Sequence, residues 1–325
     1  MTTWLLTGGA GYIGAHVLRA LQASGRDVVV LDDLSTGLER KVPQGVPLLR
    51  ASVSDRPTVA SALRDFDVTG VVHLAAKKAV GESVERPEYY YRENVDGMLS
   101  LLEAMADAGT RSLVYSSSAA VYGSPDAEFV SEDAALVPES PYGQTKVIGE
   151  WMTRNAAINQ DLSWTSLRYF NVAGAASPEL GDTSVFNLIP MVFRALSEGQ
   201  RPMVFGDDYP TPDGSCIRDY IHVSDLADAH VVAAAACEEP GVGEAYNVGR
   251  GRGVSVLEVM AMVSDVVGFD VNAQIGPRRP GDPAQLVALA DKINTQLGWS
   301  AESELREMVT SAWEAWNRPE DGEPS

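Results

Sequence analysis

A tyrosine and a lysine stand four residues apart in the segment YGQTK, residues 142–146. Residues four apart on a helix share a face, so we expect the ammonium of Lys146 beside the phenol of Tyr142. Such a cation favours the phenolate and lowers the tyrosine pKa from about 10 towards neutrality. Three serines, residues 116–118, follow a short apolar run and can place a hydroxyl against a substrate oxygen. The pattern predicts Tyr142 as a general base assisted by Lys146 and Ser118.

A glycine-rich segment, TGGAGYIG at residues 7–14, follows an apolar run and precedes apolar residues at helical spacing. It fits both the GxGxxG and the GxxGxxG pattern. Glycines there let the backbone approach a pyrophosphate, and the helix N-terminus supplies N–H donors and a positive dipole. Asp32 stands 18 residues after Gly14, at the end of a β-branched run, where it can bind a ribose 2′-hydroxyl. Asp33 beside it would repel a 2′-phosphate, so we expect NAD rather than NADP.

Two arginine segments suit a diphosphate ligand. Arg218 lies in IRDY, residues 217–220, and Arg278 and Arg279 open the segment RRPGD, residues 278–282. Arginine binds phosphate oxygens through two parallel hydrogen bonds. On these residues alone, ion pairing at the surface explains the arginines equally well.

Neither the histidines nor the cysteines indicate a metal site. His222 and His230 stand near two aspartates, but at a spacing that offers no shared ligand face. Cys216 and Cys237 lie in unrelated contexts, which favours two free thiols and a reducing compartment.

The elements that must position these residues form an alternating pattern. Short, continuous apolar runs at residues 4–7, 28–31, 71–76 and 113–115 are separated by helical stretches such as residues 97–108. Continuous apolarity is typical of strands buried on both faces, and the alternation predicts stacked βαβ units. We therefore expect an α/β fold with a Rossmann-type doubly wound parallel sheet.

The alternation weakens after residue 170, where Pro, Gly and Asp become frequent. We predict an NAD-binding domain over residues 1–175 that regains a segment near 219–238. A smaller C-terminal α/β domain that binds the substrate then covers residues 176–325. The tail, residues 317–325 (NRPEDGEPS), is expected to be disordered.

Composition narrows the classes of partner. The chain of 325 residues has 25 Lys and Arg against 45 Asp and Glu, a formal net charge of −20. That charge argues against nucleic acid and against docking on anionic lipid. No apolar run approaches the roughly 20 residues that span a bilayer, and the glycine motif leaves no room for a signal peptide. We expect a cytoplasmic protein whose site carries its own positive field.

Several segments together resemble the extended short-chain dehydrogenase/reductase family, and within it the UDP-glucose 4-epimerases. The resemblance runs from the glycine motif at residues 7–14 to LGW at residues 297–299. The serine segment, the YGQTK segment and the glycine motif are generic to the superfamily. KAVGES at residues 78–83 and the stretch from DYPTPDG to RDYIHV, within residues 205–230, are specific to the epimerases.

The resemblance implies reversible epimerisation at C4 of a UDP-hexose, through a 4-keto intermediate and transient reduction of bound NAD. It also implies a homodimer. Two alternatives remain: the enzyme acts on another UDP-sugar, either UDP-N-acetylglucosamine or UDP-glucuronate, or the protein is a non-catalytic NAD-binding sensor. A 4,6-dehydratase is disfavoured, because Ser118 is followed by Ala119 and Ala120, which cannot transfer protons.

The resemblance and the motifs together define the candidate site residues. The catalytic residues are Ser118, Tyr142 and Lys146. The cofactor-binding residues are Gly8, Gly11, Tyr12, Ile13, Gly14, Asp32, Asp33, Leu34, Ser35, Ser52, Val53, Leu74, Ala75, Ala76, Lys78, Asn94, Ser116, Tyr142, Lys146 and Phe170. The substrate-binding residues are Lys78, Ser118, Tyr142, Asn171, Asn187, Leu188, Met203, Val204, Phe205, Arg218, Arg279, Asp282 and Leu286.

Three positions depart from the family pattern. Ser52 stands where relatives often have an aspartate near the adenine. Leu286 occupies the position that gates the C2 substituent of the sugar, and its intermediate size leaves N-acetylated sugars open. Leu289 replaces a common aspartate, and we have no functional interpretation of that change.

Overall fold

A seven-stranded sheet forms the centre of the computed structural model, which describes residues 2–279 and 281–318. All neighbouring strands in it are parallel, in the order β10-β6-β5-β4-β1-β2-β3. This confirms the expected doubly wound α/β fold. The strands are β1 (Thr3–Thr7), β2 (Asp27–Asp32), β3 (Leu48–Arg50), β4 (Val68–His73), β5 (Ser112–Ser116), β6 (Ser163–Tyr169) and β10 (Gly243–Val248).

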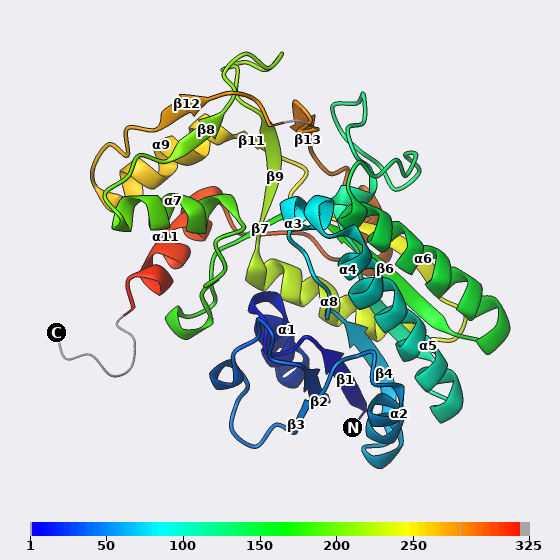
Figure 1. Cartoon of the computed structure of the whole chain (residues 1–325). Helices are drawn as coiled ribbons and strands as arrows, with labels where there is room; N and C mark the ends of the chain where they lie inside the picture. Colours follow the sequence, from blue (N-terminus) through cyan, green and yellow to red (C-terminus); the bar gives the residue numbers. More distant parts are fainter. Residues whose placement is uncertain (1, 280, 319–325) are drawn as a thin grey trace.

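Helices cover both faces of this sheet (Figure 1). Side chains alternate along each strand, so Trp4 and Leu6 pack in one core and Leu5 in the other. This is why the strand segments are apolar at every position instead of every second one. The helices are α1 (Tyr12–Ala23) and α8 (Val223–Cys237) on one face, and α2 (Arg56–Asp65), α5 (Gly97–Ala108) and α6 (Pro141–Gln160) on the other.

The strand order reverses between β1 and β4. The chain winds outwards from β1 through β2 to β3, then crosses back and winds the other way from β4. Ligands of open parallel sheets bind in the crevice outside the carboxyl ends of the strands at such a switch point. The loops after β1, β2, β4, β5 and β6 therefore meet at one edge, and they carry the predicted site residues.

A second, smaller set of strands lies beyond that edge (Figure 1). β9 (Ile217–His222) pairs with β7 (Asn171–Ala173), β11 (Gly253–Ser255) and β13 (Gln285–Leu286), and β8 (Met203–Phe205) pairs with β12 (Gln274–Gly276). A separate apolar core joins these strands to their helices. The helices are α7 (Leu188–Ser197), α9 (Val256–Val267) and α11 (Leu305–Trp316).

Shorter elements complete the chain. Asn94 lies in a π-helical turn that continues into α5. The elements are α3 (Val80–Glu85), α4 (Pro87–Tyr90), α10 (Asp291–Leu297), the π-helical turn η2 (Tyr91–Asp96), and the 3-10 turns η1 (Glu39–Lys41), η3 (Ala119–Val121) and η4 (Pro178–Leu180).

After the first part of the smaller domain, the chain returns to the large sheet, but over a different segment from the expected residues 219–238. β9 belongs to the smaller sheet, whereas α8 packs on α1 and β10 pairs with β6 along its whole length. The returning segment therefore continues to Val248, because Ala245, Tyr246 and Val248 bury their side chains at the β6 edge.

The predicted disordered tail, residues 317–325, falls largely outside the described residues, which end at residue 318. Within the described ranges, no helix is both long and apolar enough to cross a bilayer.

Candidate active site

The glycine-rich loop joins β1 to α1 through a turn that side chains would block. A Cβ on Gly14 would lie 2.0 Å from the carbonyl oxygen of Gly8, and one on Gly8 would lie 2.8 Å from the amide nitrogen of Ala75. Gly8 also has a φ of 75°, which favours glycine. Gly11 is the N-cap of α1, and no side chain caps the helix there. The first N–H groups of α1 are therefore available to an anionic ligand, as a pyrophosphate site requires.

Asp32 ends β2 next to this loop. Its buried carboxylate accepts the N–H of Ala10 at 2.9 Å and the N–H of Leu34 at 2.9 Å. Burial raises the pKa of Asp32. The carboxylate thus links the glycine loop to the loop after β2, and Asp33 follows with its own bonds to Ser35. Ala10, Asp32 and Asp33 form the wall expected to face the adenosine ribose.

Asn94 connects the loop after β4 to the catalytic helix. Its side-chain oxygen accepts the N–H of Lys77 at 2.8 Å, and its nitrogen donates to the carbonyl of Lys77 and to the hydroxyl of Thr145, both at 3.0 Å. The predicted cofactor residue Asn94 therefore fixes the loop that carries Ala75, Ala76 and Lys78. Lys78 reaches in turn to the hydroxyl of Ser184, at 3.4 Å.

The predicted catalytic residues come together at the ends of β5 and α6. Ser140 caps α6 by accepting the N–H of Gly143 at 3.1 Å, which places Tyr142 in the first turn. The Lys146 ammonium donates to the carbonyl of Ser116 at 2.7 Å and lies 5.9 Å from the centroid of the Tyr142 ring. Burial lowers the pKa of Lys146 to about 8.

The pKa of Tyr142 moves opposite to the expectation. Burial raises the pKa of this phenol, and a hydrogen bond with Ser118 only partly opposes that effect. The Lys146 ammonium donates its hydrogen bond to the backbone carbonyl of Ser116 and not to the phenol. The lowering predicted from the four-residue spacing is therefore wrong for the protein alone.

Ser116 is held from two sides. Its carbonyl accepts from Lys146, and its hydroxyl is 2.9 Å from the Nε2 atom of His230 on α8. His222, the other histidine considered for a metal, caps α8 by accepting the N–H of Ser224 at 3.0 Å. Both histidines thus have roles in holding the fold around the site.

Several predicted substrate residues lie on or next to the strands of the smaller sheets, whereas Lys78, Ser118 and Tyr142 belong to the part around the large sheet. Arg218 on β9 forms an ion pair with Asp282. The guanidinium carbon of Arg279 lies 3.9 Å from the centroid of the Phe205 ring on β8. Arg278 points elsewhere: it stacks on Tyr209 at 4.2 Å and bonds to Asp208. Of the two neighbouring arginines, Arg279 therefore lies with Phe205 on β8, and its role as a ligand of a nucleotide diphosphate stays a prediction.

Leu286 links this arginine group to the catalytic loop. It pairs with Arg218 in the register of β13 and β9. It also packs on the buried cluster that contains Ala119, Val121 and Phe170. Because Ala119 directly follows Ser118, Leu286 connects the strand of Arg218 with the segment next to the catalytic serine.

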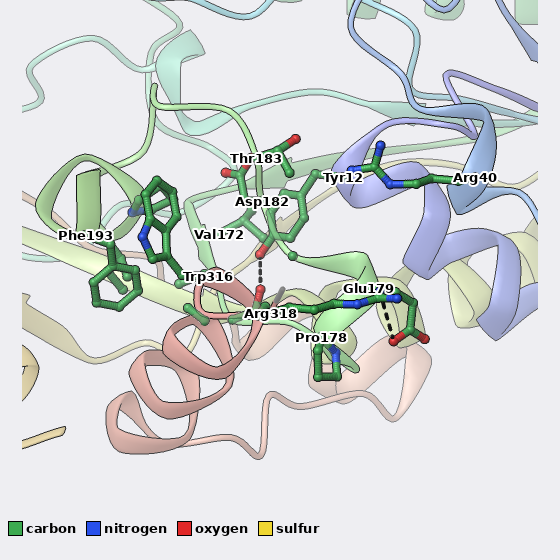
Figure 2. Close-up of a pocket in the computed structure, with 17 residues that line it drawn as sticks. Tyr12, Arg40, Val172, Pro178, Glu179, Asp182, Thr183, Phe193, Trp316 and Arg318 are labelled. Atoms are coloured by element: carbon green, nitrogen blue, oxygen red, sulfur yellow. Dashed lines mark hydrogen bonds and ion pairs between the residues drawn. The ribbon is translucent and has the colours of Figure 1, made fainter. Parts of the chain in front are cut away.

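A cavity of about 430 Å³ opens beside the first turn of α1 (Figure 2). Among the predicted site residues, Tyr12 lines it, and the Tyr12 hydroxyl donates to the carbonyl of Gly174 at 2.5 Å. Asp182 also lines it and accepts from the side chain of Asn187 at 2.7 Å. Tyr142 and Arg218 do not line this cavity, so we place the chemistry at the strand ends and not there.

The sequence patterns did not indicate a site role for two buried charged residues near the catalytic group. Glu150 on α6 and Arg168 on β6 form an ion pair at 2.7 Å, with side chains 1% and 3% exposed. The spacing of Glu150, four residues after Lys146, was a usable signal. Nothing in the sequence pairs it with Arg168.

This combination of fold and site defines a protein of the short-chain dehydrogenase/reductase class. The chain belongs to the NAD dependent epimerase/dehydratase family, whose family model matches residues 4–249.

Individual relatives cover nearly the whole chain. It is 45% identical to the UDP-glucose 4-epimerase of Azospirillum brasilense over 319 residues, which are 97% of this chain and 91% of that protein. It is 43% identical to the UDP-glucose 4-epimerase of Corynebacterium glutamicum, covering 95% of this chain and 94% of that protein. The structure of the Stenotrophomonas maltophila UDP-glucose 4-epimerase, solved with NAD and formylated UDP-arabinopyranose, has a TM-score of 0.93 and 38% identity. That match covers 97% of this chain and 98% of the other.

Proposed function

We propose that the protein is an isomerase that interconverts UDP-glucose and UDP-galactose at C4 of the sugar, with NAD as resident cofactor. One observation carries the proposal. Tyr142, Ser118 and Lys146 meet at the sheet edge that also carries the glycine-rich loop, while Arg218 stands on β9 and Arg279 in the loop after β12. The names of the relatives and the ligands of the solved neighbour support it.

The residues around the glycine loop fit NAD. The space that a Cβ would fill at Gly8 and Gly14 lets the backbone approach a pyrophosphate closely. The uncapped N-terminus of α1 supplies N–H donors, and Asp32 stands at the end of β2 where a ribose hydroxyl is expected. Bound NAD supplies the acceptor, and later the donor, of the hydride that leaves C4 of the sugar.

Tyr142 is the proposed carrier of the proton. In its phenolate form, the Tyr142 oxygen takes the proton of the 4-hydroxyl in the first half of the reaction, and the resulting phenol returns a proton in the second. Ser118 hydrogen-bonds with Tyr142 and holds the substrate oxygen at the same point. Lys146 presents a positive charge to the Tyr142 ring while its bond to Ser116 keeps α6 against the serine loop. That charge favours the phenolate form of Tyr142 and acts against the desolvation that raises its pKa.

The proposed substrate half keeps the diphosphate fixed while the sugar turns. Arg218 and Arg279 bind the phosphates, and Phe205 lies under Arg279 as a wall for the uracil. Asp282 balances Arg218 until the diphosphate arrives. A 4-keto sugar can then rotate past Leu286 and present its other face, which is what inversion at C4 requires.

Leu286 is also the proposed determinant of the sugars that are accepted. Its side chain is partly buried against the segment after Ser118, so it limits the space beside C2. A UDP-hexose with a free 2-hydroxyl fits this description best. UDP-N-acetylglucosamine and UDP-glucuronate are the alternative substrates.

We further propose a homodimer in the cytoplasm. Leu99 on α5 and Trp151 and Ile158 on α6 are exposed apolar side chains on two adjacent helices, a surface suited to a second copy.

Both cysteines are buried and unpaired in the part of the chain that the structure describes, which suits a reducing compartment such as the cytoplasm. Recovery of the protein in a membrane or periplasmic fraction of its cells would contradict this location.

A substrate panel tests the proposed function. Purified protein, without added NAD, is incubated with UDP-galactose, UDP-N-acetylgalactosamine or UDP-galacturonate, and the products are separated by chromatography. We expect UDP-glucose from UDP-galactose, with kcat/KM at least about tenfold above the other two. Equal turnover of the N-acetylated sugar would overturn the role of Leu286. Absence of turnover on all three, with NAD bound, would favour the sensor alternative.

A further inference from the structure

A buried carboxylate, Glu150, lies one helical turn beyond Lys146 on α6. The mechanism above does not use it. We propose that Glu150 is a positioning residue for the proposed epimerase reaction, on which this inference rests: it fixes the serine loop against α6 and places a carboxylate one helical turn from Lys146. Its role follows from two sets of hydrogen bonds, to Ser117 and to Arg168, and from its electrostatic interaction with Lys146.

The first contact is to the serine loop. The Ser117 hydroxyl donates to the Glu150 carboxylate at 2.6 Å. Lys146, one turn earlier, donates to the carbonyl of Ser116 at 2.7 Å. The loop is therefore tied to α6 at two consecutive residues, and Ser118 is the next residue along. Any loosening at Ser117 moves Ser118 relative to Tyr142.

The second contact fixes Glu150 itself. Arg168 on the neighbouring strand β6 donates to both carboxylate oxygens, from Nε at 2.9 Å and from Nη2 at 2.7 Å. The remaining nitrogen of Arg168 donates to the hydroxyl of Tyr122 and the carbonyl of Glu132, both at 3.0 Å. Two parallel bonds allow one orientation of the carboxylate. Glu150 thus cannot turn away from Ser117 without leaving Arg168 unsatisfied.

The third interaction is with the charge of Lys146. The groups that face this ammonium are His73 on β4, Tyr115 on β5, and Tyr142 and Glu150 on α6. Burial lowers the pKa of His73 to about 3 and raises that of Tyr115. Both are therefore neutral near pH 8, and Glu150 is the anion beside Lys146. Two further groups border the same space and are also neutral near pH 8, Tyr169 on β6 and His230 on α8.

Burial alone disfavours the charged form of Lys146 and brings its pKa down to about 8, while Glu150 acts in the opposite direction. Removing the carboxylate therefore lowers the pKa of Lys146 further. A neutral Lys146 has no positive charge to place by Tyr142. Loss of this charge would disfavour the phenolate form of Tyr142 and so slow the proton transfer.

A role in folding alone explains the arrangement poorly. Burying an ion pair has a large desolvation cost, and apolar side chains of similar volume often stabilise a fold as well or better. The pair stands against the catalytic loop instead of in the apolar cores on either side of the sheet. A structural role and a positioning role also predict different results for Lys146, which can be measured directly.

The test uses the pKa of Lys146, which needs no substrate. The chain has five lysines, so the Cε resonances of ¹³C-lysine-labelled protein can be followed by NMR as the pH is raised. The Lys146 resonance is assigned by its loss in K146R. We expect a pKa near 8 in the wild type. In E150Q we expect a pKa lower by about one unit, because one neighbouring negative charge has been removed.

Two matched variants separate charge from position. S117A keeps the ion pair, so its Lys146 pKa should equal that of the wild type, while kcat with UDP-galactose falls roughly tenfold as Ser118 is displaced. E150Q/R168Q removes the unpaired guanidinium that could unfold E150Q; its Lys146 pKa should still be lower than in the wild type, by less than in E150Q because a positive charge has been removed as well. Thermal unfolding of every variant checks that it is folded.

A Lys146 pKa in E150Q and in E150Q/R168Q equal to that of the wild type would overturn the proposal, whatever their stability. Wild-type kcat in S117A would overturn the link between Ser117 and Ser118. Failure of the wild type to convert UDP-galactose would contradict the proposed function instead. The NMR result would still decide whether Glu150 sets the charge of Lys146.

Discussion

Tyr142 has no single strong partner that makes it a base. Ser118 hydrogen-bonds with it and Lys146 stands near its ring, yet burial raises its pKa in the protein alone. The residue types and their spacing were sufficient to predict which side chains meet. They could not predict the direction of the pKa shift, because desolvation depends on tertiary packing that spacing does not describe. Glu150 was missed for a similar reason, since Arg168, its partner, is 18 residues away on another element.

The residue-scale prediction is the loss of the proton carrier. Y142F removes one hydroxyl and keeps the ring, so we expect kcat with UDP-galactose to fall about 10³-fold while NAD stays bound. Chromatographic rate assays and the absorbance of the bound nicotinamide measure these two quantities. Y246F is the matched control, because the buried Tyr246 bonds to Gln296, outside the proposed catalytic residues. Wild-type turnover in Y142F would remove Tyr142 from the mechanism.

At the scale of elements, the βαβ units were predictable and the smaller sheets were not. β1, β2, β4 and β5 are continuous apolar runs because helices cover both of their faces. β7, β9, β11 and β13 have two to six residues each, and their partners are distant in sequence. Their pairing depends on tertiary contacts. Without it, the position of Leu286 beside Arg218 could not be derived from the residues.

At the scale of elements, we predict that the helices α5 and α6 form the interface of a homodimer. Trp151 is 54% exposed and Ile158 is 77% exposed on α6, and Leu99 on α5 is 48% exposed. If a second copy covers them, sedimentation velocity should give a dimer for the wild type and a monomer for W151E/I158E. F269E, at a residue 54% exposed after α9, is the matched control and should remain a dimer. A dimer of W151E/I158E with wild-type stability would place the interface elsewhere.

The whole molecule is strongly acidic, yet both proposed ligands are diphosphates. The net charge of −20 offers them no long-range attraction. The structure offers local positive groups instead: an uncapped helix N-terminus behind the glycine loop, Arg218 on β9, and Arg279 in the loop after β12. The net charge of the whole molecule therefore affects its solubility and disfavours nucleic acid and anionic lipid as partners. Binding of the two diphosphates depends instead on a few positive groups at the junction of the two sets of strands.

The central claim is that hydrogen leaves and returns to C4 within one closed cycle. UDP-galactose carrying deuterium at C4 tests it most directly, with the product analysed by NMR and mass spectrometry. We expect UDP-glucose that keeps the deuterium at C4 when the reaction runs in ordinary water. We also expect no incorporation of ¹⁸O from labelled water at the 4-hydroxyl during rapid turnover. Replacement of the deuterium by solvent hydrogen at the rate of turnover would contradict hydride transfer to and from a resident NAD.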